Sequence, residues 1–202
     1  MLEVRIHGRG GQGAQVACQI LAAALFRSGR AVQAFAAYGG ERRGAPVTAF
    51  LRADDRPLRV RCDVERPHHV LVLDPTMLED PRIVADVRTD GLVVVNCREA
   101  PSVTLPEGVR LVAVDAAAIA QRAGLGPIVS TAMAGAFGGA TGLVTPDDLS
   151  AAVLEGSPTR KRENALACAA GYREAAGFAS PSDDEAEGER ERRRTWEAGD
   201  AS

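Results

Sequence analysis

A glycine-rich loop near the N-terminus has the composition of an anion-binding site: Gly8-Arg9-Gly10-Gly11-Gln12-Gly13. Glycines let the backbone turn sharply, and they let its amide N–H groups come close to an anion. The spacing Gly-x-Gly-x-x-Gly also matches the dinucleotide-binding pattern. Arg9 and Gln12 lie inside the loop and favour contact with a phosphate or a carboxylate. From these residues alone, a tight turn without a ligand is an equally good interpretation.

One part of the nicotinamide-binding pattern is missing. That pattern requires an acidic residue about 20 positions after the glycine loop, at the end of the second strand, where it holds a ribose hydroxyl. The second predicted strand covers residues 31–36, and neither Asp nor Glu ends it. The first acidic residue after this strand is Glu41, which lies inside a second glycine-rich loop.

The elements around the first loop are a strand and a helix. Leu2, Val4 and Ile6 alternate with polar residues, which is the pattern of a strand. Residues 14–26 are rich in alanine and leucine and predict a helix, which Ser28-Gly29 would end. A strand, a glycine loop and a helix in this order are the opening of an α/β nucleotide-type fold.

Further strands are predicted by short apolar runs along the first 115 residues. The continuous runs indicate strands that are buried on both faces of a parallel sheet. The predicted strands cover 47–52, a short segment 58–61, 69–74, 92–96 and 111–114. Asp74 ends one of them at the edge where ligands of α/β sheets bind, and we expect it to brace the loop. Together these features predict a three-layer α/β/α domain with a mostly parallel sheet.

The C-terminal part is predicted to be helical. Asp115 would cap a helix over 116–123, and Thr145 would cap another, with Pro146 in its first turn. Small residues in 128–139 would allow backbones to pack closely, and 158–176 would form the last helix. Beyond this helix the apolar pattern stops. We therefore expect one domain over 1–178 and a charged, disordered tail over 179–202.

Composition and charge exclude several functional classes. The 202 residues suffice for one well-buried domain, and 46% of them are hydrophobic. Residues 180–202 hold eight acids and four arginines, so this segment contributes −4 to the net charge of −3 and leaves the body near +1. A nearly neutral body argues against nucleic-acid binding. No apolar stretch is long enough to cross a membrane, and we expect a cytoplasmic protein.

The cysteines and histidines are interpreted as structural. The four cysteines are far apart in the sequence and predict neither a zinc site nor an iron–sulfur site, so we expect small buried hydrophobic side chains: Cys18, Cys62, Cys97 and Cys168. His7 ends the first strand and is expected to be a hydrogen-bonded structural residue instead of a general base.

The glycine loop is followed, about 30 residues later, by a second loop that reads Tyr38-Gly39-Gly40-Glu41-Arg42-Arg43-Gly44-Ala45. Together the two loops resemble the gamma subunit, or the equivalent domain, of the 2-oxoacid:acceptor oxidoreductases that act on pyruvate, 2-oxoglutarate or indolepyruvate. The family pattern is Gly-x-Gly-Gly-Gln-Gly followed by Tyr-Gly-x-Glu-x-Arg-Gly-Gly. Ala45 replaces a family glycine, and Ser130-Thr131-Ala132-Met133 stands where an Asn-Met pair is common.

This resemblance implies a Rossmann-like fold and a role within a larger enzyme. Such enzymes decarboxylate a 2-oxoacid oxidatively to an acyl-CoA, with thiamine diphosphate, magnesium and iron–sulfur clusters, and pass electrons to ferredoxin. This chain lacks the Gly-Asp-Gly…Asn motif of thiamine enzymes and lacks clustered cysteines. The resemblance therefore places those cofactors on alpha, beta and delta subunits or on other domains of a fused chain, and this chain would not be catalytic alone.

The resemblance also indicates where a ligand would bind. The glycine loop would line the cavity near thiamine diphosphate or hold a phosphate of coenzyme A. Arg42 and Arg43 would make charge-assisted hydrogen bonds to an anion, with Glu41 orienting one of them. The expected cofactor-binding residues are Gly8, Arg9, Gly10, Gly11, Gln12, Gly13, Glu41, Arg42 and Arg43. The alternative for Glu41, Arg42 and Arg43 is an ion network between subunits.

Two other functions are compatible with the residues. One is a free-standing Rossmann-like oxidoreductase or nucleotide-binding protein, which tight binding of NAD(P) by the isolated chain would favour. The other is an interaction module without a binding role, which undiminished turnover after loss of Arg9, Arg42 and Arg43 would favour.

Overall fold

A six-stranded sheet forms the centre of the computed structural model, which describes residues 1–38, 44–60 and 62–178. The strands are β1 (Leu2–Arg9), β2 (Ala31–Tyr38), β3 (Pro46–Asp54), β4 (His69–Val72), β5 (Leu92–Asn96) and β6 (Arg110–Val114). Their order is β2-β3-β1-β4-β5-β6. Neighbours among β1, β4, β5 and β6 pair in parallel, whereas β3 is antiparallel to both β1 and β2. The predicted α/β fold with a mostly parallel sheet is confirmed.

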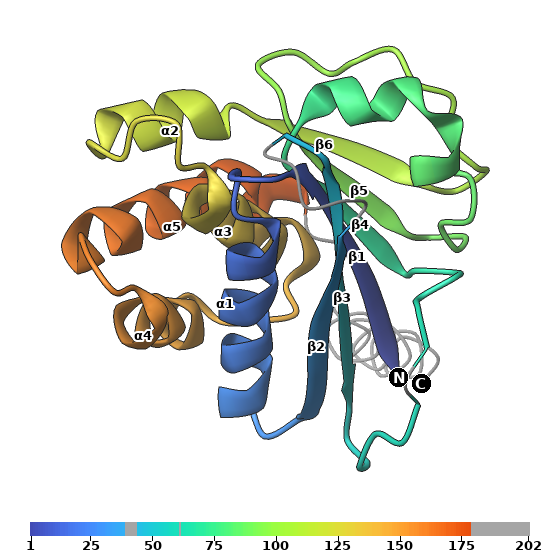
Figure 1. Ribbon diagram of the computed structural model, residues 1–202, viewed down its shortest axis with the longest axis horizontal. Coiled ribbons are helices and arrows are strands. Elements are labelled where there is room, and N and C mark those ends of the chain that lie inside the picture. Colours follow the sequence, from blue (N-terminus) through green and yellow to red (C-terminus); the bar gives the residue numbers. More distant parts are fainter. Residues whose placement is uncertain (39–43, 61, 179–202) are drawn as a thin grey trace, which may run out of the picture.

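The α-helices lie on one face of this sheet (Figure 1). They are α1 (Ala14–Arg27), α2 (Ala116–Arg122), α3 (Ser130–Thr141), α4 (Pro146–Gly156) and α5 (Lys161–Ala175). On the other face, the chain between β4 and β5 forms two short 3-10 helices, η1 (Pro75–Glu79) and η2 (Pro81–Ile83). Met77, Leu78 and Val84 from this segment pack on the valines of β4 and β5. This outer layer therefore consists of short turns, and it covers β4 and β5.

The predicted helix ends are found in the structure. The Asp115 carboxylate accepts a hydrogen bond from the Ala118 amide at 2.8 Å, and the Thr145 hydroxyl accepts one from the Asp148 amide at 3.1 Å. Gly29 has a φ of 87° just after α1, which a residue with a side chain adopts only at a cost. These local signals fix where α1, α2 and α4 begin or end.

Helix α3 is the buried centre of the helical layer. Every residue from Ser130 to Ala140 is buried, which explains why the segment is apolar on all sides. Gly135 lies against the carbonyl group of Cys168 in α5, and Gly171 of α5 lies against the carbonyl group of Ala132. The prediction that small residues allow close backbone packing here is confirmed.

Three sequence predictions are wrong. Residues 58–60 are coil instead of a strand, because Pro57 precedes them and β3 is already paired on both sides, with β1 and with β2. The last helix begins at Lys161, three residues later than expected, because Arg160 adopts a left-handed conformation with a φ of 50°. Cys62 is exposed, although Cys18 and Cys168 are buried as expected.

The predicted tail over 179–202 lies outside the described residues. Within the part of the chain that is described, no helix is long and apolar enough to cross a membrane.

Candidate functional site

The glycine loop connects the end of β1 to the start of α1. Gly11 and Gly13 have φ angles of 99° and 83°, a region that side chains other than glycine rarely adopt. Gly13 also caps α1. A Cβ atom on Gly8 would lie 3.2 Å from the Cβ of Ala14, so this glycine lets β1 approach the helix closely. The glycines are therefore explained by the geometry of the turn.

Polar side chains brace this loop against the end of β4. Arg9 Nε and Gln12 Nε2 both donate to Asp74 Oδ2, at 3.0 and 2.9 Å. The Arg9 amide donates to Gln12 Oε1 at 2.7 Å, and Arg9 Nη2 donates to Thr76 Oγ1 at 3.0 Å. Asp74 thus braces the loop, as the sequence predicted. The hydrogen bonds that the structure shows for the side chains of Arg9 and Gln12 are all made with other residues of this chain.

The two sequence motifs meet at the same place. The Gly10 amide donates to the carbonyl oxygen of Ala45 at 2.8 Å, and the Gly44 amide donates to the carbonyl oxygen of Gly10 at 3.3 Å. The end of the second motif is therefore hydrogen bonded to the first. Glu41, Arg42 and Arg43 lie outside the described residues.

A cavity of about 350 Å³ lies at the N-terminus of α1. It is lined by Arg9, Gly10, Gly11, Gly13, Ala14, Gln15, Val16 and Val47. The first turn of α1 contains no acidic residue, so the positive end of the helix dipole is not neutralised there. Val16, which also lines this cavity, is 45% exposed. These features suit an anionic group such as a phosphate.

The segment that departs from the family pattern borders the glycine loop. A Cβ atom on Gly13 would lie 2.9 Å from the Cβ of Ser130. The next residue, Thr131, donates a hydrogen bond to Asn164 Oδ1 at 3.2 Å. A substitution at Ser130 therefore changes the wall of the loop directly.

The strand order explains the missing ribose-binding acid. In a dinucleotide fold the second strand lies beside the first, and its end reaches the cofactor. Here β3 occupies the position next to β1, and β2 is the edge strand beyond it. The end of β2 is therefore separated from the glycine loop by a strand, which argues against nicotinamide binding.

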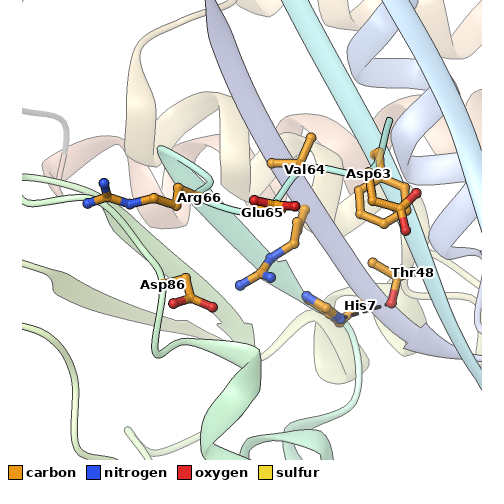
Figure 2. Close-up of a pocket in the computed structure, with 9 residues that line it drawn as sticks. His7, Thr48, Asp63, Val64, Glu65, Arg66 and Asp86 are labelled. Atoms are coloured by element: carbon orange, nitrogen blue, oxygen red, sulfur yellow. Dashed lines mark hydrogen bonds between the residues drawn. The ribbon is translucent and has the colours of Figure 1, made fainter. Parts of the chain in front are cut away.

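A second cavity, of about 600 Å³, lies on the opposite face of the sheet (Figure 2). It is lined by Arg5, His7, Thr48, Phe50, Asp63, Val64, Glu65, Arg66 and Asp86. His7 Nδ1 lies 3.3 Å from Thr48 Oγ1, so His7 is hydrogen bonded as expected. Sequence reasoning missed this cavity. The polar residues that alternate along β1 indicated that Arg5 and His7 lie on this face of the sheet. The segment 62–66, which borders the cavity, contains no motif that could have predicted it.

Asp74 stabilises the glycine loop with its charge, so its loss should weaken the fold. Burial raises the pKa of this carboxyl, but hydrogen bonds from Thr76 and Gln12 and the charge of Arg9 outweigh burial and lower it. In the unfolded chain the pKa of Asp74 is near 3.8, and in the folded protein it is lower. The stabilisation is therefore complete above pH 3.8 and is lost as the pH falls through the pKa of the folded protein. We expect Asp74→Ala to cost about 2 kcal/mol in the free energy of unfolding. Urea unfolding should give the same cost at pH 7 and pH 5.

The buried histidines should make the protein less stable in mild acid. Burial, together with the charge of Arg5, lowers the pKa of His7 to about 3, and burial lowers that of His69 to about 4. Below pH 6.5 the unfolded chain binds protons at these sites and the folded chain does not, so stability decreases. We expect a loss of about 2 kcal/mol per histidine between pH 7 and pH 5.

The variant His7→Gln tests this dependence. Urea unfolding at pH 7 and pH 5 should show that the variant loses about 2 kcal/mol less than the original protein between the two pH values. An equal loss in both proteins would show that His7 is not the source.

Metal ligands are not clustered in the described part of the chain, and two of the four thiols are buried. No group of three or more His, Cys, Asp or Glu residues there is placed to hold a metal ion. Burial raises the pKa of the Cys18 and Cys168 thiols to about 12, so both stay protonated at neutral pH.

Comparison with known sequences gives a consistent result. Residues 3–174 match the model of the pyruvate ferredoxin/flavodoxin oxidoreductase family. The chain is 44% identical over 175 residues to pyruvate synthase subunit PorC of Methanocaldococcus jannaschii, covering 86% of this chain and 97% of the relative. It is 46% identical over 160 residues to the common gamma subunit of pyruvate/ketoisovalerate oxidoreductases of Pyrococcus abyssi, covering 77% and 86%.

A solved structure supports the same relationship. The crystal structure of pyruvate oxidoreductase subunit PORC from Thermotoga maritima is 35% identical in sequence and superposes with a TM-score of 0.74. The match covers 85% of this chain and 95% of that one. Both the sequence and the arrangement of the elements are thus shared over nearly the whole described chain.

Proposed function

The chain belongs to the pyruvate ferredoxin/flavodoxin oxidoreductase family as a gamma-type member, and we propose that it is the gamma subunit of a 2-oxoacid:ferredoxin oxidoreductase. The observation that carries this proposal is the 44% identity over 97% of a pyruvate synthase subunit. The complete enzyme would convert a 2-oxoacid and coenzyme A to an acyl-CoA and carbon dioxide, with ferredoxin as the electron acceptor. Pyruvate is the first substrate to test, because it is named for all three relatives above.

The partners would be the alpha and beta subunits, with a delta subunit in some assemblies. Thiamine diphosphate, magnesium and iron–sulfur clusters would be bound by these partners. Thiamine enzymes bind the diphosphate through magnesium with a Gly-Asp-Gly…Asn motif, which this sequence lacks. The described residues also contain no cluster of metal ligands. The reactive groups would therefore come from outside this chain, in a cytoplasmic complex.

The contribution of this chain would be a rigid anion-binding cradle beside the reaction centre. The cavity at α1 has backbone amide groups and the positive end of a helix dipole at its base, and Arg9 at its edge. A phosphate of coenzyme A has the charge and size for such a site. Arg42 and Arg43 would add positive charge, and Asp74 would hold the loop in place through Arg9 and Gln12.

Anaerobic co-purification tests the proposed role. The tagged chain is co-expressed with the alpha and beta subunits encoded by the same organism and purified without oxygen. We expect a brown complex that contains iron, sulfide and thiamine diphosphate, whereas the chain expressed alone should be colourless. Failure of the chain to associate with these subunits, or tight binding of NAD(P) by the isolated chain, would contradict the proposal.

The cradle itself is tested by a charge-removing variant. Replacing Arg42 and Arg43 together by alanine should raise the KM for coenzyme A of the assembled enzyme at least about tenfold, because each guanidinium would contribute a charge-assisted contact. The KM for the 2-oxoacid serves as the internal control and should change less than about twofold. An unchanged KM for coenzyme A would favour the role of these residues in a subunit ion network.

A further inference from the structure

An apolar groove of about 400 Å³ lies between α4 and α5, which pack side by side in the helical layer (Figure 1). Leu149 of α4 and Cys168 of α5 line it and are only 1% and 2% exposed, so they form its floor. Ala169 and Tyr172 of α5 line its wall. Leu149 and Tyr172 face the same point of α3, because a Cβ atom on Gly138 would lie 2.6 and 3.4 Å from their side chains. The groove therefore suits a large apolar side chain.

The rim of the groove carries one charge of each sign. Arg173 of α5 lines the groove, and Asp147 follows Pro146, which lines it on the α4 side. Both charged side chains are exposed, and among the described residues neither forms an ion pair or a side-chain hydrogen bond. The neighbouring Asp148, by contrast, accepts a hydrogen bond from the Thr145 hydroxyl at 2.8 Å. The rim therefore has a positive and a negative group available to a charged occupant.

The chain leaves the described structure beside this groove. Ala176 lines the groove, and Phe178 is the last described residue. Residues 179–202 follow, beyond the region that matches the family model. They contain Trp196, the only tryptophan of the chain. The single indole ring of the chain thus belongs to a segment that starts at the edge of the groove.

The charges around Trp196 are complementary to those of the rim. Three arginines precede it at 192–194, and Glu197 follows it. An arginine of this group can pair with Asp147, and Glu197 can pair with Arg173. A segment that carries both signs around a large apolar ring therefore matches both the floor and the rim of the groove.

The covalent connection favours this segment over a separate protein. Phe178 and Trp196 are 18 positions apart, and a flexible chain of this length spans roughly 20–25 Å on average. The groove lies within that distance, because Ala176 lines it. A tether of this kind gives an effective concentration of about 1 mM. A contact too weak to hold a separate molecule is then sufficient.

We propose that the groove between α4 and α5 is the docking site of the chain's own segment 192–197. The indole ring of Trp196 enters the groove and covers Leu149 and Tyr172, and the charged residues on either side of it pair with the two charges of the rim. Docking removes the apolar floor from solvent. The contact needs no partner subunit, so it is independent of the proposed function.

Tryptophan fluorescence of the full chain tests the proposal, because Trp196 is the only tryptophan. The reference is a synthetic peptide of residues 188–202. We expect the full chain to emit at shorter wavelengths and to be quenched by acrylamide at least about threefold less than the peptide, since docking removes most of the indole ring from solvent. Equal emission and equal quenching in the full chain and the peptide would overturn the proposal.

The variant Ala169→Glu tests whether the groove is the docking site. Ala169 is exposed, and glutamate is a good helix former, so the fold should stay intact. The new carboxylate would enter the groove and pair with Arg173 four residues later. We expect Trp196 of this variant to be quenched as strongly as the peptide.

The matched control is Ala117→Glu, the same change at an exposed alanine of α2. It should leave the quenching of Trp196 unchanged, and circular dichroism should show that both variants are folded. If Trp196 stayed as protected in Ala169→Glu as in the control, the groove would not be its site and the proposal would be overturned.

Dilution separates the chain's own segment from that of a second copy. Docking within one chain predicts the same quenching over an about hundredfold range of protein concentration. Quenching that rises on dilution, together with a dimer in analytical ultracentrifugation, would place Trp196 in the groove of a second copy and overturn docking within the chain.

Discussion

The variant Gly135→Val is expected to lose most of the stability of the fold. Gly135 of α3 faces the backbone of α5, where an added Cβ atom would overlap the carbonyl group of Cys168. Gly139 and Gly171 make equally close contacts with the backbones of Tyr172 and Ala132. Because backbone atoms on both helices would have to move apart, we expect a loss of about 4 kcal/mol or more in the free energy of unfolding.

Urea unfolding of the purified chain measures this loss. The matched control is Gly156→Ala at the end of α4, where no atom lies within 4 Å of the added Cβ. This control should be neutral or stabilised by about 0.5 kcal/mol, because alanine reduces the freedom of the unfolded chain. If Gly135→Val were as stable as the control, the close crossing of α3 and α5 would be wrong.

The variant Arg52→Ala is expected to cost about 3 kcal/mol, because it leaves a buried carboxylate without one of its partners. Arg52 is 1% exposed, and its Nε donates to Glu3 Oε1 at 3.0 Å. Its Nη1 and Nη2 donate to the carbonyl oxygens of Cys62 and Asp63, at 2.6 and 3.1 Å. One side chain thus links β3 to β1 and holds the segment 62–63 against the sheet.

Thermal and urea unfolding, together with hydrogen exchange of residues 62–66, test the role of Arg52. The control is Arg82→Ala, because Arg82 pairs with Asp80 on the exposed surface and its loss should have little measurable effect. The double variant Glu3→Gln, Arg52→Met should recover part of the loss, since it removes the unpaired charge. Equal stability of Arg52→Ala and Arg82→Ala would contradict the buried network.

Much of the fold follows from local patterns. The apolar runs of β4 and β5, the glycine after α1, and the caps Asp115 and Thr145 identify elements without reference to distant residues. The glycine loop and the bracing role of Asp74 were predictable for a similar reason. Both lie at the carboxyl ends of neighbouring parallel strands, which meet at one edge of the sheet.

The remaining features depend on contacts between residues far apart in the chain. Strand β3 lies between β1 and β2, and no local pattern distinguishes this order from that of a dinucleotide fold. Arg52 is the last residue of the predicted strand 47–52, and no local pattern indicates that the coil 62–63 buries it. The binding roles of Gly8 to Gly13 and of Glu41, Arg42 and Arg43 stay predictions, as does the division at residue 178.

We propose that this chain supplies an anion-binding cradle to a reaction centre whose reactive groups are held by other subunits. The most direct test is the anaerobic reduction of a viologen dye by pyruvate and coenzyme A, measured for this chain alone, for the alpha and beta subunits alone, and for all of them together. We expect no turnover by the chain alone and the highest turnover by the complete assembly. Turnover of the 2-oxoacid by the chain alone, with a metal or coenzyme of its own, would contradict it.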